Sequence, residues 1–71
     1  MKLIVINEQG DLSMVEVARL CVNGNSDTIS FVDINGDEGE VIVNVKNDMS
    51  AVKDGVLRNA SVIVLQGNVV S

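Results

Sequence analysis

The spacing of apolar residues changes repeatedly along this chain, and these changes of period limit the folds that the chain can adopt. Short apolar runs and β-branched runs are typical of strands, whereas repeats every three to four residues are typical of helices. The expected strands are residues 2–6, 28–34, 40–45 and 61–65, and the expected helices are residues 13–22 and 49–57. The order β-α-β-β-α-β predicts an α+β fold, a two-layer open-faced sandwich.

The segment of residues 13–22 decides between two architectures. Ser13 and Glu16 have the spacing of a helix capping box. Apolar residues follow at helical spacing, at Met14, Val17, Ala18 and Cys21. Three valines favour a strand instead, because β-branched side chains lose rotamer freedom in a helix. We predict a helix here, and the alternative is a small mostly-β barrel with this segment as a strand.

The first and last predicted strands are apolar on both faces. Residues 2–6 include four consecutive aliphatic side chains, and residues 62–65 include four more. A strand of this kind is either covered on both sides within its own domain, or has one face that meets another chain.

The turn of residues 33–40 begins like a calcium-binding loop. Oxygen-bearing side chains stand at its first, third and fifth positions, which are Asp33, Asn35 and Asp37. The sixth position should be glycine and is Glu38, and the twelfth should be glutamate and is Asn44. An Asn-Gly turn between two strands explains these residues as a hairpin, and weak cation binding is the alternative.

Composition indicates one domain, residues 1–71, with few chemical groups. The chain has no histidine, and Cys21, its single cysteine, is expected to be a small buried hydrophobic residue without an intramolecular disulfide. The net charge is −5 and the five basic residues are scattered, which argues against nucleic-acid binding. No apolar run approaches the length of a membrane span, so no membrane association and a cytoplasmic location are expected.

Catalysis is not expected from this composition. Neither Cys21 nor any serine has a histidine base to activate it, and one cysteine cannot build a zinc site. The glycines are dispersed rather than gathered into a phosphate-binding loop. Glu38 and Glu40 fit a solvated strand rim better than an acid–base pair. We therefore expect a non-enzyme without metal or cofactor.

The second half of the chain resembles the phosphocarrier protein HPr of the sugar phosphotransferase system. Five residues fall in step with that family without gaps: Lys46, Met49, Gly55, Val56 and Val62. The phospho-accepting histidine corresponds to Leu12, the regulatory serine to Asn47, and the third helix has no counterpart. The resemblance therefore implies the HPr-like fold and a docking face, without phosphoryl transfer.

The same resemblance implies which residues contact a partner. HPr proteins dock through apolar residues at the start of the first helix and along the second, which correspond here to Leu12, Met14, Met49 and Val52. A missing third helix would leave apolar surface exposed, so self-association as a homodimer is expected. The leading expectation is an HPr-like regulatory or interaction protein with a protein partner; the alternative is a small mostly-β protein-binding or inhibitor module.

Overall fold

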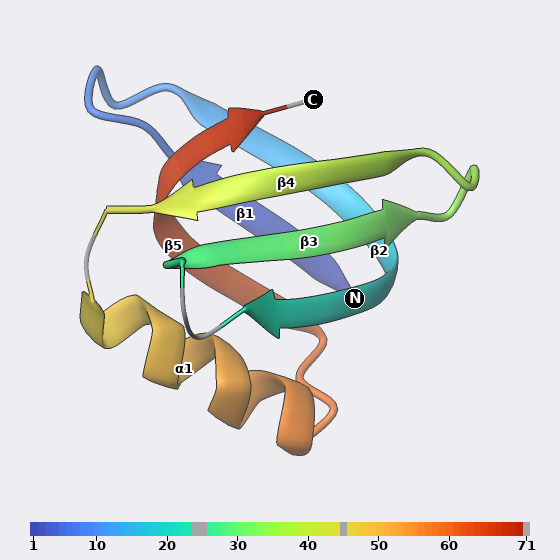
Figure 1. Ribbon diagram of the computed structural model, residues 1–71. Helices are drawn as coiled ribbons and strands as arrows, with labels where there is room; N and C mark the ends of the chain where they lie inside the picture. The colour runs from blue at the N-terminus through green and yellow to red at the C-terminus, as the bar shows by residue number, and fades with distance from the viewer. Residues whose placement is uncertain (24–25, 45, 71) are drawn as a thin grey trace.

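The chain folds into a five-stranded barrel with one helix, in a computed structural model that describes residues 1–23, 26–44 and 46–70. The elements in chain order are β1 (Lys2–Ile6), β2 (Leu12–Asn23), β3 (Thr28–Asp33), β4 (Glu38–Val43), α1 (Lys46–Leu57) and β5 (Val62–Val70). Each strand pairs antiparallel with the next, and β5 closes the barrel by pairing parallel with β1 (Figure 1). The predicted β-α-β-β-α-β sandwich is therefore wrong, and the small mostly-β alternative fits.

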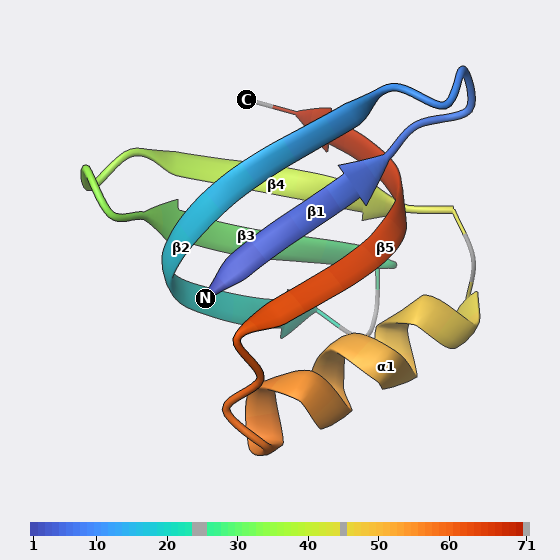
Figure 2. The same ribbon diagram turned by 180° about the vertical axis from the view of Figure 1, so that it is seen from behind.

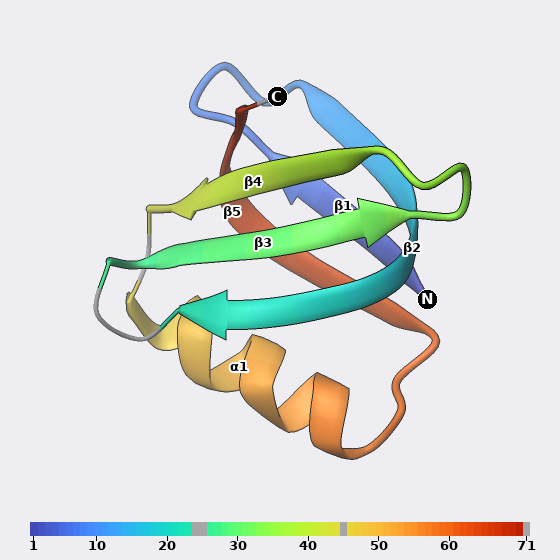
Figure 3. The same ribbon diagram turned by 45° about the vertical axis from the view of Figure 1, so that its right-hand side comes forward.

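A β-bulge explains why residues 13–22 resemble a helix in sequence and form most of β2 instead. Val15 and Val17 pack into the core, and beyond a register shift between Val17 and Arg19, Leu20 and Val22 do so. One extra residue at the bulge changes the spacing of core residues from two to three at that point. Strand alternation interrupted in this way imitates a helical repeat. The bulge also bends β2, whose first part pairs with β1 and second part with β3 (Figure 3).

The loop between β1 and β2 and the loop between β3 and β4 have the same pattern of hydrogen bonds, which stabilises both hairpins. In each, the first side chain, Asn7 or Asp33, accepts hydrogen bonds from backbone N–H groups two and four residues later, at 2.9 to 3.0 Å. Gly10 and Gly36 have positive φ angles and occupy the bulge position of a three-residue hairpin loop. The predicted hairpin is confirmed, and one carboxylate oxygen of Asp33 is engaged by its own loop.

The predicted second helix is confirmed as α1, which begins three residues earlier than expected. It lies across one end of the barrel and contacts β5, β2 and β4 (Figures 1 and 2). Met49 and Val52 insert into the core, with Val56 packed against them. The carboxylate of Asp48, in the first turn, accepts a hydrogen bond from the Gln66 backbone N–H at 2.9 Å. The helix therefore closes the barrel at this end.

The barrel interior is apolar throughout the described residues, with no buried polar or charged side chain among them. The buried residues are Leu3, Val5, Val17, Ile29, Phe31, Val41, Val43, Met49, Val52, Ile63 and Leu65. The buried residues on the strands alternate with outward side chains, as the period of two requires. Met49 and Val52 come from α1. Val41 and Val43 share one face as predicted, whereas Val45, expected to join them, lies outside the described residues.

Candidate docking surface

Six outward apolar side chains cover three neighbouring strands on one side of the barrel. They come in pairs from β1 (Ile4, Ile6), β2 (Leu12, Met14) and β5 (Val62, Val64), and we call this surface the β2-β1-β5 face. The strand register aligns Met14, Ile4 and Val64 in one row across the three strands. In Figure 2 these strands cross the front of the molecule, and α1 lies below them rather than over them.

Four of the six side chains of this face are exposed, and Ile4 and Ile6 are half-buried between them. Leu12 and Met14 are 68% and 66% exposed, and Val64 is 54% exposed. From the exposed fractions of the six side chains we estimate roughly 400–500 Å² of exposed apolar surface, near the middle of the range of about 300–600 Å² for the largest patch on a typical monomer. We take this contiguous patch as the candidate docking surface, because the largest apolar patch on a protein is often functional.

Sequence reasoning found two residues of this face and missed the other four. Leu12 and Met14 are both exposed on this face. Met49 and Val52, predicted to join them, are 8% and 0% exposed beneath α1, so the structure places them in the core instead. The assignment of these two residues to a docking surface is thereby corrected.

A usable signal for the missed residues was present in the sequence. Ile4, Ile6, Val62 and Val64 belong to the two strands that are apolar on both faces. The barrel covers only their inner faces, where Leu3 and Ile63 contact the core. The outer faces of these two strands are therefore not covered by any other described element of the barrel.

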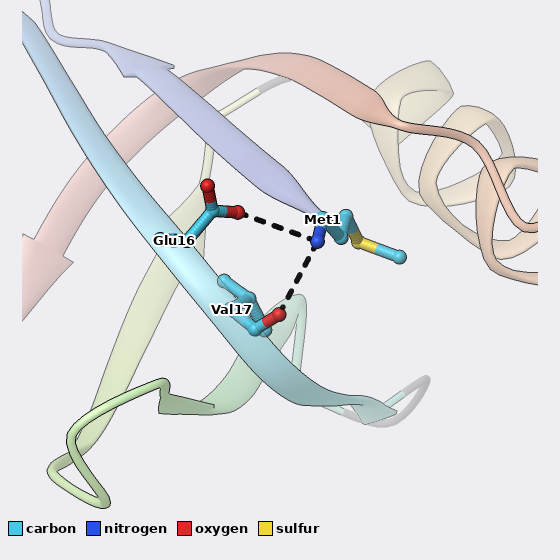
Figure 4. A network of polar contacts seen from close by, with 3 residues as sticks. All are labelled: Met1, Glu16 and Val17. Carbon is cyan, nitrogen blue, oxygen red and sulfur yellow. Dashed lines mark hydrogen bonds and ion pairs between the residues drawn. The ribbon is translucent and has the colours of Figure 1, made fainter.

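Charged residues border this face at both ends of β1. Lys2 stands at one end, opposite Glu16 on β2. The Glu16 carboxylate is 3.4 Å from the N-terminal ammonium of Met1, which also donates to the Val17 carbonyl (Figure 4). At the other end, the β1–β2 loop has the exposed carboxylates of Glu8 and Asp11. The first end therefore has two cationic groups, Lys2 and the Met1 ammonium, against one carboxylate, whereas Glu8 and Asp11 make the other end acidic.

The opposite side of the barrel has a shallow groove of about 640 Å³ over β2, β3 and β4. Its outer rows include Arg19 with Glu38, and Cys21 with Glu40, in register across the strands. Cys21 is exposed, which corrects the expectation that it is buried. Glu38 and Glu40 stand on the solvated outer rim, as predicted. Charged side chains therefore border this groove, but Phe31, Val32 and Val70 also line it, and more of its surface is apolar than polar.

The described part of the chain was also compared with the requirements of a metal site and of a membrane-spanning helix. Within residues 1–23, 26–44 and 46–70, no three His, Cys, Asp or Glu side chains gather where they could hold a metal ion. No helix among these residues has the length and apolar character needed to cross a membrane.

Comparison with known proteins adds no family to this description. No family model, curated protein or solved structure matches the chain. The resemblance to HPr predicted two helices packed on a sheet, and the closed barrel overturns that architecture.

Proposed function

We propose that this protein is a small mostly-β protein-binding module, which acts by docking rather than by catalysis and requires no cofactor. The observation that supports the proposal most strongly is the apolar row of exposed Met14, half-buried Ile4 and exposed Val64, which spans three strands. Burial of apolar surface is the main favourable contribution to protein association. The sheet beneath is held by continuous strand pairing, so the face is rigid before a partner arrives and little ordering entropy opposes binding.

Site-specific photo-crosslinking in the native host tests this proposal. A photoreactive phenylalanine analogue at Met14 or at Val64 is expected to give the same covalent protein adduct, because both positions lie on one face. The matched control is the analogue at Ser30, which is exposed on β3 and faces the groove on the other side. Absence of any adduct from Met14 and Val64, or equal adducts from Ser30, would overturn the proposed docking face.

We also propose a cytoplasmic location. It is supported by the exposed free thiol of Cys21, because reducing compartments preserve such thiols. Cell fractionation tests this: the chain is expected with cytosolic markers, and recovery with an oxidising compartment would contradict it.

A further inference from the structure

We propose that the β2-β1-β5 face binds a second copy of this chain, in a twofold dimer whose β1 strands run antiparallel across the interface. The inference rests on the proposed function, because it names the partner of that same surface. Three observations on the face support it: its apolar area, the separation of its charges, and the uninterrupted apolar row at its centre.

The apolar area matches what one side of a stable dimer needs. A standard interface buries about 800 Å² per partner, of which about 56–65% is apolar. The roughly 400–500 Å² estimated for this face supplies that apolar share from one continuous patch. Two aligned sheets can stack about 10 Å apart with their side chains interdigitated, so Ile4 of one copy would lie near Ile4 of the other.

The charges select the orientation of the two copies. When two identical faces meet, the twofold axis lies in the interface plane, either along the strands or across them. An axis along the strands would place Lys2 over Lys2 and the acidic loop over itself. An axis across them instead places Lys2 of each copy toward Glu8 and Asp11 of the other. Opposite charges then meet at both ends, which favours the antiparallel arrangement.

The net charge of −5 on each chain does not prevent this contact. At physiological ionic strength, repulsion between exposed charges is screened beyond about 8 Å. Groups at the interface therefore decide the association. Arg19, Glu38 and Glu40 lie on the far side of the barrel, away from the proposed contact.

Charge reversal at the two ends provides the test. One variant is Lys2→Glu, and the other combines Glu8→Lys with Asp11→Lys. In a homodimer of either variant, like charges meet twice, so we expect the dissociation constant to rise about tenfold or more. In an equimolar mixture both contacts regain opposite charges, so a heterodimer should form with an affinity within about threefold of the parent dimer.

Energy transfer between dyes on Cys21 reports this association. Cys21 is the single cysteine and lies on the groove side, so donor and acceptor attach away from the interface. We expect transfer in the parent and in the mixture, and its loss in each charge variant alone. Val64→Lys serves as a second variant that should abolish transfer in every combination while circular dichroism remains that of the parent.

The outcomes separate this inference from the proposed function. A parent chain that sediments at its monomer mass of 7.5 kDa up to about 1 mM protein overturns the dimer. A parent dimer whose charge variants do not recover on mixing overturns the antiparallel arrangement. If the chain is monomeric while photo-crosslinks from Met14 and Val64 reach a different protein, the dimer fails and the proposed function stands. If that face gives no adduct, both fail.

Discussion

At the residue scale, the single aromatic ring of this chain depends on a glycine across the sheet. Phe31 is buried and faces Gly39 in the β3–β4 register. A Cβ atom on Gly39 would come within 2.9 Å of ring carbon Cε2 and nearer still to Cζ. We expect Gly39→Ala to lower the free energy of unfolding by about 1–3 kcal/mol through overpacking, as measured by urea denaturation.

A matched set of variants tests whether the ring is the cause. Ser30→Ala, at an exposed neighbouring position, should change the free energy of unfolding by less than about 0.5 kcal/mol. Phe31→Leu removes the ring atoms nearest Gly39, so the double variant should be more stable than the sum of the single effects predicts. Additive effects would show that the cost of Gly39→Ala arises elsewhere.

At the element scale, the two matching hairpin loops predict which substitutions each can accept. Asn7 and Asp33 make equivalent hydrogen bonds through a side-chain oxygen. Asp33→Asn and Asn7→Asp should therefore leave stability within about 0.5 kcal/mol of the parent. Alanine at either position removes the acceptor and should cost about 1–2 kcal/mol. Chemical denaturation measures these differences, and equal losses from Asp33→Asn and Asp33→Ala would contradict the loop geometry.

Most of the strands and the helix can be predicted from the sequence pattern, whereas β2 cannot. Strands β1, β3 and β4 and the helix α1 follow from uninterrupted periods, with shifts of a few residues at their ends. The prediction for β5 ends at residue 65, but the strand continues to Val70, and the part beyond the prediction pairs with β4. Both hairpin loops have the pattern Asn or Asp, two residues, Gly and Asp, so they too are readable in sequence. β2 was mistaken for a helix because the bulge near Val17 is set by tertiary packing, which a local pattern does not reveal.

At the scale of the whole molecule, two methionines predicted for the same surface have different roles. Met14→Lys should leave the free energy of unfolding within about 0.5 kcal/mol, because the side chain is exposed, but should weaken association. Met49→Ala should cost about 2–5 kcal/mol, because it opens a cavity beneath α1. Both stability changes are measured by denaturation at a protein concentration where the parent is monomeric. A large stability loss from Met14→Lys would contradict the surface assignment.

The docking face itself could be predicted only in part. The resemblance to HPr points to Leu12 and Met14 but predicts the wrong fold for this chain, and these residues reach the surface because β2 is extended rather than helical. Ile4 and Val64 join them through the parallel pairing of β1 with β5. That pairing connects the first strand to the last across almost the whole chain, and no local sequence signal specifies it.

The face exists only if β1 lies between β2 and β5, and NMR tests that arrangement most directly. We expect nuclear Overhauser contacts from Ile4 to both Met14 and Val64, with strand-type chemical shifts over residues 12–23. Helical shifts with contacts between residues three apart over residues 13–22, and no contact between Ile4 and Val64, would contradict the barrel and the docking face together.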